Sequence, residues 1–249
     1  MKRIFVNNTN AKNFALYIKK MDKRGPLEAT TLLVTGRPGD GKTKTLHNYA
    51  GGVNAVMLTA TVDSTSRRIM VELAEKLGIE VSRTYEREIE ETIQRNKTTI
   101  ILDEAGFALA NNAACIEKLR SITDVTMTLL VLVIMKHDMS KLNQPRLKQL
   151  ADRIGDICEF KRASLEDVQL ACTQLGEVAM APDLVEHIHR STDASMRQVL
   201  NAICRVEEVA KFRPEAQRGN IMTLADVRGV TLCNDFSLAM RKMNGRAGS

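Results

Sequence analysis

The chain has 249 residues, of which 44% are hydrophobic and 27% charged, and its formal net charge at pH 7 is +6. This composition is typical of a folded globular protein and excludes a disordered or low-complexity chain. Because the longest apolar run, residues 129–135, is far shorter than the roughly 20 residues of a membrane-spanning helix, we expect no membrane segment.

Hydrophobic periodicity and turn residues divide the first part of the chain into alternating helices and strands. In chain order, the patterns predict a helix at 10–21, a turn at 22–26, a strand at 30–35, a helix at 42–50, a strand at 55–59, helices at 64–77 and 86–94, a strand at 98–102, a helix at 113–122, and strands at 128–135 and 157–160. Strands that are apolar throughout and separated by helices indicate a parallel sheet covered on both faces.

After residue 161 the pattern becomes helical, with no convincing strand. The expected helices are 165–175, 184–190, 196–212 and 224–230. The predicted fold class is therefore α/β, with a five-stranded parallel sheet in a body at residues 28–161. An N-terminal helix and basic segment, 1–27, would precede this body, and a small all-helical lid with a basic tail, 162–249, would follow it.

The cysteines and the N-terminal residues indicate the cellular compartment in which the protein is expected. The five cysteines are scattered, and none lies in a Cys-x-x-Cys pair or a Cys/His cluster with metal-ligand spacing. They are interpreted as reduced thiols, which suits a reducing compartment. Polar residues 7–10 interrupt any signal-peptide core. We therefore expect a cytoplasmic protein.

The positive charge is concentrated at the start of the chain. Residues 1–44 carry ten Lys and Arg against three Asp and Glu, whereas the rest of the chain is close to balanced. Basic surfaces attract nucleic acid through counterion release. Part of this excess belongs to the phosphate-binding motif described next, so charge alone is weak evidence for nucleic-acid binding.

Residues 36–43 match the complete pattern Gly-x-x-x-x-Gly-Lys-Ser/Thr, between a predicted strand and a predicted helix. The backbone N–H groups of such a loop and the following helix N-terminus point positive partial charge at phosphates. Lys42 is expected to reach the β- and γ-phosphates, and Thr43 to ligate Mg²⁺. The predicted nucleotide-binding residues are Gly36, Arg37, Pro38, Gly39, Asp40, Gly41, Lys42, Thr43 and Thr45. The alternative, a glycine-rich turn without a ligand, is disfavoured by the flanking elements.

A second carboxylate motif follows the predicted strand 98–102. Asp103 and Glu104 end this apolar strand, and the carboxyl ends of parallel strands open at the same edge of a sheet as the phosphate loop. Asp103 is expected to hold Mg²⁺ through water, and Glu104 to polarise the attacking water as general base. The alternative is that the two acids only end the strand or begin a helix.

The two motifs, in this order and spacing, resemble the Walker A and Walker B motifs of the AAA+ superfamily of ATPases, over most of the chain. The resemblance implies an AAA+ P-loop body with a helical lid, ATP and Mg²⁺ as cofactors, and hydrolysis of ATP to ADP and phosphate. Adenine is implied by the resemblance alone, although no guanine-reading Asn-Lys-x-Asp motif is present.

Three further positions correspond to the superfamily by local pattern. Lys136, after the strand 128–135, stands where the superfamily keeps a polar sensor of the γ-phosphate, usually Asn or Thr. Arg153 resembles the arginine finger that acts on a neighbouring subunit's nucleotide, and pairing with Asp152 or Asp156 is its alternative role. Arg197, which follows Asp193 where a glycine is customary, resembles the lid sensor, and an ordinary salt bridge is the alternative.

Within the superfamily, the chain resembles transposition regulators of the Mu B, TnsC and IstB type, in its compact body, its Asp-Glu-Ala motif and its layout. This resemblance implies a ring or helical filament of the protein on duplex DNA, without sequence specificity, that presents target DNA to a transposase. It also implies the cytoplasm of a bacterium or of a phage-infected host. The residues that would contact DNA are Thr65, Ser66, Arg67, Arg68, Lys118 and Arg120, from the regions 61–68 and 111–120, which contain the residue types that bind phosphates.

Rival interpretations share the phosphate loop. A helicase loader or clamp-loader-like replication ATPase would have the same fold and site, and nothing in the sequence separates it decisively from a transposition regulator. A small-molecule kinase is disfavoured, because it needs neither an arginine finger nor a helical lid. A solvated helix start is the alternative role for Arg67 and Arg68.

Overall fold

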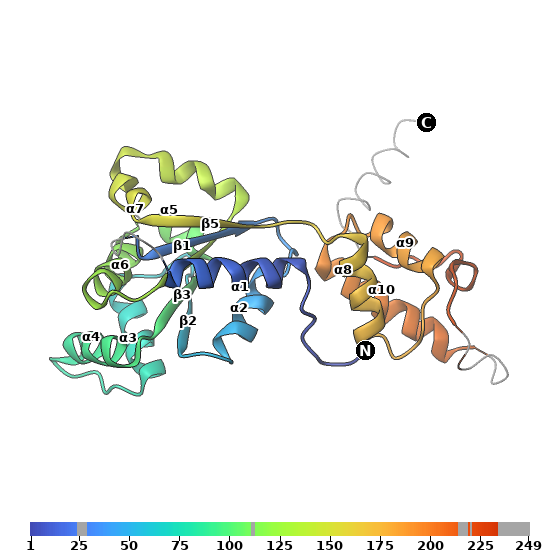
Figure 1. Ribbon diagram of the computed structural model, residues 1–249, viewed down its shortest axis with the longest axis horizontal. Helices are drawn as coiled ribbons and strands as arrows, with labels where there is room; N and C mark the ends of the chain where they lie inside the picture. Colours follow the sequence, from blue (N-terminus) through green and yellow to red (C-terminus); the bar gives the residue numbers. More distant parts are fainter. Residues whose placement is uncertain (24–28, 111–112, 214–218, 220, 234–249) are drawn as a thin grey trace. The chain divides into compact units, whose positions relative to one another are not determined.

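The computed structural model describes residues 1–23, 29–110, 113–213, 219 and 221–233 (Figure 1). The chain forms two compact units. The α/β unit consists of Asn13–Arg37 and Lys42–Phe160, and the C-terminal unit consists of Met1–Lys12, Pro38–Gly41 and Lys161–Ser249. The middle of the phosphate loop therefore belongs to the C-terminal unit. The expected division of the body at residues 28–161 stays a prediction.

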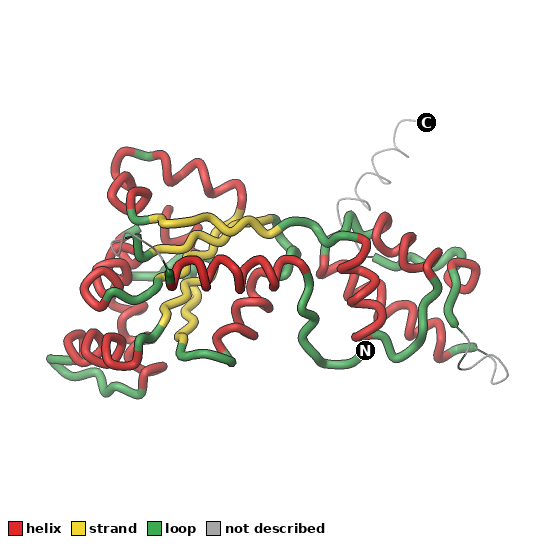
Figure 2. The backbone as a smooth tube through the Cα atoms, in the orientation of Figure 1, coloured by secondary structure: helices red, strands yellow, loops and turns green. Residues whose placement is uncertain are grey.

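The α/β unit is built on one five-stranded sheet, coloured yellow in Figure 2. All of its paired strands run parallel. The strands are β1 (Thr31–Gly36), β2 (Ala55–Thr59), β3 (Thr99–Asp103), β4 (Leu130–Met135) and β5 (Ile154–Phe160), in the order β2-β3-β4-β1-β5. The predicted parallel sheet is confirmed. Since the strands are parallel, Gly36 and Asp103 end β1 and β3 at the same edge.

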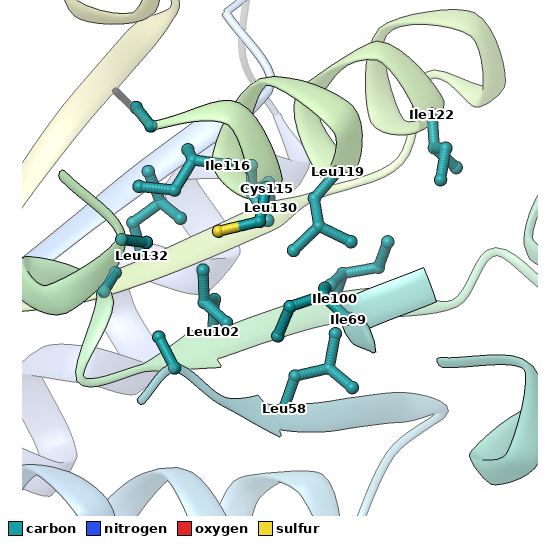
Figure 3. Close-up of a cluster of buried hydrophobic side chains, with 14 of the residues drawn as sticks. Leu58, Ile69, Ile100, Leu102, Cys115, Ile116, Leu119, Ile122, Leu130 and Leu132 are labelled. Carbon is teal, nitrogen blue, oxygen red and sulfur yellow. The ribbon is translucent and has the colours of Figure 1, made fainter. Parts of the chain in front are cut away.

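Both faces of the sheet are covered, as the apolar strands predict. Helices α3 (Ser66–Leu77), α4 (Tyr85–Asn96), α5 (Ala105–Ala110) and α6 (Ala114–Thr126) contribute to the core on one face, and α1 (Thr9–Asp22) and α2 (Lys42–Ala50) to the core on the other. Successive side chains of a strand alternate between the faces. In β3, Ile100 and Leu102 join the first core, shown in Figure 3, and Ile101 joins the second.

The third helix shows how local sequence sets an element. Thr65 caps the N-terminus of α3, where its hydroxyl accepts a hydrogen bond from the backbone N–H of Arg68. Gly78 ends the helix with a φ of 71°, as the sequence predicts. Between these caps, Ile69 and Leu73 lie buried on the face that packs into the core.

Three parts of the α/β unit differ from the prediction. Helix α5, directly after Asp103 and Glu104, is not among the predicted elements. Strand β5 begins at Ile154, three residues earlier than expected, because it is an edge strand whose first residues are half-exposed and lack an apolar run. The segment between β4 and β5 holds unpredicted short helices. These are two 3₁₀ segments, Lys136–Asn143 and Pro145–Leu147, and α7 (Lys148–Asp152), each too short to show a helical period.

The C-terminal unit is mainly helical and has a core of its own. Its helices are α8 (Leu165–Leu175), α9 (Pro182–Ser191) and α10 (Met196–Lys211). Val168, Ile188 and Ile203, one from each helix, are fully buried in this core. A capping box between Ser164 and Asp167 begins α8.

The predicted helix 224–230 is wrong. Only a 3₁₀ turn, Leu224–Val227, forms there, and Gly229 follows with a φ of 84°. Met222, just before it, forms a β-bridge with Met180. The basic tail, with Arg241, Lys242 and Arg246, lies outside the described residues. In the described part of the chain, no helix is long and apolar enough to cross a membrane.

Candidate nucleotide-binding site

The phosphate loop runs from the end of β1 to the start of α2, as the motif predicts. Gly39 and Gly41 have φ values of 84° and 90°, a conformation that residues with a Cβ rarely adopt. At Gly39 an added Cβ would also overlap Ser195 Oγ, which belongs to the same C-terminal unit. The backbone conformation therefore favours glycine at this position, and a residue with a Cβ would also have to displace the Ser195 hydroxyl.

Lys42 is buried at the base of the loop, with 7% of its surface exposed. Its Nζ donates hydrogen bonds to the carbonyl oxygens of Gly36, at 3.1 Å, and Arg37, at 3.0 Å. Met135 Sδ, at the end of β4, lies 3.6 Å from the same ammonium. A buried ammonium needs such acceptors to offset its lost hydration. These contacts hold the positively charged end of the Lys42 side chain at the base of the loop. Thr45, one turn further, is buried in α2.

Thr43 and Asp103 meet across the sheet edge. The Thr43 Oγ1 hydroxyl donates a 2.7 Å hydrogen bond to Asp103 Oδ2, and Asp103 is only 3% exposed. Hydroxyl and carboxylate oxygens are ligands that Mg²⁺ accepts, usually together with water and substrate phosphates. Among the described residues, no group of three His, Cys, Asp or Glu side chains could hold a metal alone. The residues present therefore fit an Mg²⁺ ion shared with a nucleotide.

Glu104 links β3 to α5 in a left-handed backbone conformation, with a φ of 54°. Its N–H donates a 2.8 Å hydrogen bond to Asp103 Oδ1, which fixes the carboxylate of the preceding residue. A non-glycine residue at such a φ costs about 1–3 kcal/mol, and such residues cluster at active sites. The two adjacent acids therefore lie in different environments. Asp103 is buried and hydrogen-bonded to Thr43, whereas Glu104 is half-buried at a strained turn.

Asp138 is a buried acid close to Gly106 that no sequence motif indicates. It is 5% exposed and lies so close to Gly106 that a Cβ there would overlap its carboxylate. Lys141 pairs with it at 2.6 Å. Its only signal in the sequence is its position shortly after β4, close to the predicted sensor.

The predicted sensor Lys136 lies at the end of β4 and is exposed. Its Nζ pairs with Glu159 of β5. Because β4 and β5 both flank β1, this pair lies beside the start of the phosphate loop. Its role as a sensor of the γ-phosphate stays a prediction.

The predicted arginine finger, Arg153, lies between α7 and β5. It is at the N-terminal ends of the strands, whereas Asp103 is at the C-terminal end of β3. The carbonyl of Arg153 accepts a hydrogen bond from the N–H of Thr31, the first residue of β1. Its Nε lies 3.6 Å from Asp124 Oδ2. Asp156, one of its alternative partners, pairs with Lys20 instead.

The predicted lid sensor Arg197 lies in the first turn of α10, where its side chain is exposed. Its backbone N–H donates a 3.1 Å hydrogen bond to the carbonyl of Gly39, within the C-terminal unit. No ion pair to its guanidinium is found within the described part of the chain. Arg162, which no motif indicated, also contacts the loop through Asp40.

The predicted DNA contacts divide into two groups. Ser66, Arg67 and Lys118 line one hollow of about 610 Å³ between α3, α4 and α6. Arg83, not predicted, lines it too. Arg68 instead pairs with Asp63, and Thr65 caps α3.

Arg120 does not line the hollow. It is largely buried, with 17% of its side chain exposed, and pairs with Glu117 and Asp124 of its own helix. These carboxylates raise the pKa of Arg120 against the opposing effect of its burial. The start of the predicted region, residues 111–112, lies outside the described residues.

Comparison with known proteins identifies a domain in the segment that contains this site. A family model described as an AAA domain matches residues 27–142, which contain both motifs. No curated protein sequence matches the chain. Since the matched segment includes the loop and Asp103–Glu104, the chain carries an AAA-type ATPase domain, binds nucleotide and is an ATPase.

Several solved structures share the fold. The ORC2 protein of Aeropyrum pernix, in its ADPNP–ADP complexes, matches with a TM-score of 0.66 and 15% identity, over 92% of this chain and 68% of that one. The Holliday junction branch migration motor RuvB of Thermotoga maritima matches with a TM-score of 0.62 and 18% identity, over 94% and 74%. The A. pernix ORC1 protein in complex with DNA matches with a TM-score of 0.59 and 17% identity, over 86% of this chain and 63% of that one. At these identities the likeness establishes the fold alone.

Proposed function

We propose that the chain is an Mg²⁺-dependent ATPase that hydrolyses ATP to ADP and phosphate, binds duplex DNA without sequence specificity, and assembles under nucleotide control. The hydrogen bond between Thr43 and Asp103 carries the first part, because it brings two Mg²⁺-type ligands together beside Lys42. A bound Mg²⁺ would neutralise charge on the β- and γ-phosphates.

Each residue of the site has a proposed task. Lys42 would exchange its carbonyl partners for oxygens of the β- and γ-phosphates. The loop N–H groups would bind the remaining phosphate oxygens. Glu104 would orient the attacking water and accept its proton. Lys136 and Arg197 would sense the γ-phosphate, as the resemblance implies.

Self-assembly is supported by the position of Arg153. It lies at the edge of the sheet opposite Gly36 and Asp103, about one strand length from the motifs of its own subunit. Strands of six residues span about 20 Å, which a single arginine side chain does not cover. Arg153 would therefore act on the nucleotide of a neighbouring copy, in a ring or a helical filament.

The DNA surface that we propose is the hollow between α3, α4 and α6. Arg67, Arg83 and Lys118 line it, with Glu86 as its only acid, and Glu86 pairs with Lys118. No carboxylate pairs with Arg67 or Arg83 in the described part of the chain. Exposed arginines without carboxylate partners suit backbone phosphates, which are sequence-independent ligands. The fold likeness to ORC1 in complex with DNA supports the proposal that the chain binds DNA.

For the biological use of this DNA-bound assembly, we propose delivery of target DNA to a transposase in a bacterial or phage-infected cytoplasm. The resemblance to transposition regulators supports it. The second candidate is a helicase-loader or clamp-loader-like replication ATPase, and the fold likeness to ORC proteins favours that alternative.

Negative-stain electron microscopy with long duplex DNA separates these functions. With a slowly hydrolysed ATP analogue, a filament former should coat DNA in proportion to its length, and the Lys42→Ala variant should not. Small rings that ignore DNA length would support the replication candidate. A protein that binds DNA equally well without nucleotide would contradict nucleotide-controlled assembly.

A further inference from the structure

Asp40 places a carboxylate inside the loop that is expected to bind phosphates. It lies between Gly39 and Gly41, and only 1% of its side chain is exposed. A buried negative charge at this place would repel a polyphosphate, because Coulomb energies are large where water is excluded. The loop therefore needs a cation that neutralises Asp40 before it can bind an anion well.

Arg162 supplies that cation. Its Nη1 donates to Asp40 Oδ1 at 2.8 Å and to the carbonyl oxygen of Pro38 at 3.2 Å. Its Nη2 donates to Asp193 Oδ2 at 3.3 Å. Asp193 is 74% exposed, so water already screens its charge, and the buried Asp40 is the partner that depends on Arg162.

The surrounding backbone holds the pair in place. Asn10 Nδ2 donates to the carbonyl of Lys161, at 2.7 Å, and to that of Asp40, at 3.3 Å. In return, Asn10 Oδ1 accepts a hydrogen bond from the N–H of Lys161. One side chain thus binds the backbone of Asp40 and of the residue before Arg162, all within the C-terminal unit.

We propose that Arg162 is a positioning residue of the nucleotide site. It neutralises Asp40 and fixes the loop carbonyl of Pro38, so that the loop N–H groups are free of a competing negative charge. One donor of Arg162, the buried Nε–H, has no acceptor among the described residues, so the guanidinium has capacity for a further hydrogen bond. This inference rests on the proposed binding of ATP at the loop.

The proposal predicts strong coupling between two substitutions. Arg162→Ala leaves Asp40 buried and unpaired, and should raise the Kd for ATP about tenfold or more. Asp40→Asn, which removes the charge but keeps the shape, should raise the Kd far less than Arg162→Ala does. In the double variant, Asp40→Asn should restore most of the lost affinity, as coupled neighbours do.

Titration of the full chain with a fluorescent ATP analogue measures these constants, with saturated turnover measured in parallel. A positioning residue should change Kd far more than kcat. Arg162→Lys should fall between wild type and Arg162→Ala, because an ammonium keeps the charge but loses the planar fork. The matched control is Arg190→Ala, which removes an exposed arginine of α9 that pairs with Glu186.

The outcomes are distinct. A wild-type chain that binds no nucleotide contradicts the proposed function itself. A wild type that binds, with Arg162→Ala binding equally well, overturns the role of Arg162. A loss that Asp40→Asn does not restore also overturns it, because the effect would then be purely structural. If Arg162→Ala does not fold, the Arg162→Lys variant with and without Asp40→Asn provides the same comparison.

Discussion

Thr43 Oγ1 donates a 2.7 Å hydrogen bond to Asp103 Oδ2, so the second residue of α2 meets the last residue of β3. Sixty positions separate the two in the chain. Parallel strands bring them together, because the loop after β1 and the end of β3 open at one edge of the sheet. Three predictions concern this edge.

Thr43→Ala should abolish the Mg²⁺ dependence of nucleotide binding. The substitution removes one oxygen ligand and leaves Asp103 buried without its hydroxyl donor, which destabilises by about 1–3 kcal/mol. Nucleotide affinity, measured with Mg²⁺ and with EDTA, should become the same in both buffers. Thr43→Ser keeps the hydroxyl and should retain a Mg²⁺ effect. Equal Mg²⁺ effects in wild type and Thr43→Ala would remove Thr43 from the metal site.

Glu104→Gln should leave ATP binding intact and lower turnover by about 10²-fold or more, the usual contribution of a general base. The amide has the same shape and the same unfavourable backbone conformation, so the stability of the protein should not change. Phosphate release measured at saturating ATP tests this. A variant that hydrolyses ATP at the wild-type rate would exclude Glu104 as the base.

Gly39→Ala should weaken both folding and nucleotide binding. Its φ of 84° costs about 1–3 kcal/mol for a residue with a Cβ, and the new methyl group would overlap Ser195 Oγ. Adding Ser195→Ala should relieve the overlap but not the backbone cost. Thermal unfolding of the single and double variants should therefore show partial recovery. Full recovery would mean that the backbone conformation is not restrictive.

The main motif and the sheet could be predicted because their signals are contiguous. Residues 36–43 form one string, and the apolar strands make the sheet visible from their composition. Arg162 and Arg83 could not be found in this way. Each is a single residue outside any motif, and the role of Arg162 depends on Asp40, which lies 122 positions away. Physical contact, not local pattern, defines these residues.

The sequence around Arg120 indicates that this arginine is paired. Glu117 and Asp124 stand three residues before it and four after it, the spacings at which helical side chains meet. The structure pairs Arg120 with both acids. The spacing alone therefore indicates an arginine paired within α6 and not a free phosphate contact.

The buried thiols predict how stability depends on pH. Burial raises the pKa of Cys158 to about 12 and that of Cys172 to about 11, above the ordinary value of 9.0. The native state therefore holds these protons more tightly than the unfolded state. Their contribution to stability is complete below pH 9 and is lost as pH rises toward 11–12. Urea unfolding at pH 8 and pH 10 should show a lower free energy of unfolding at pH 10, and Cys158→Ala should show a smaller decrease.

The last prediction concerns the hollow between α3, α4 and α6. Replacing both Arg67 and Arg83 by Ala should weaken binding to any duplex sequence by a similar factor. It should also lower the slope of log K against log salt concentration by about two, since each phosphate contact contributes about 0.9.

The charge-matched control is the variant Arg87→Ala with Arg95→Ala. Both residues are exposed on α4 and neither lines the hollow, and Arg87 already pairs with Glu91. Charges that do not contact phosphates release fewer counterions than charges that do. The control should therefore keep nearly the wild-type slope. Equal decreases in the two double variants would mean that DNA responds only to net charge and that the hollow is not its contact surface.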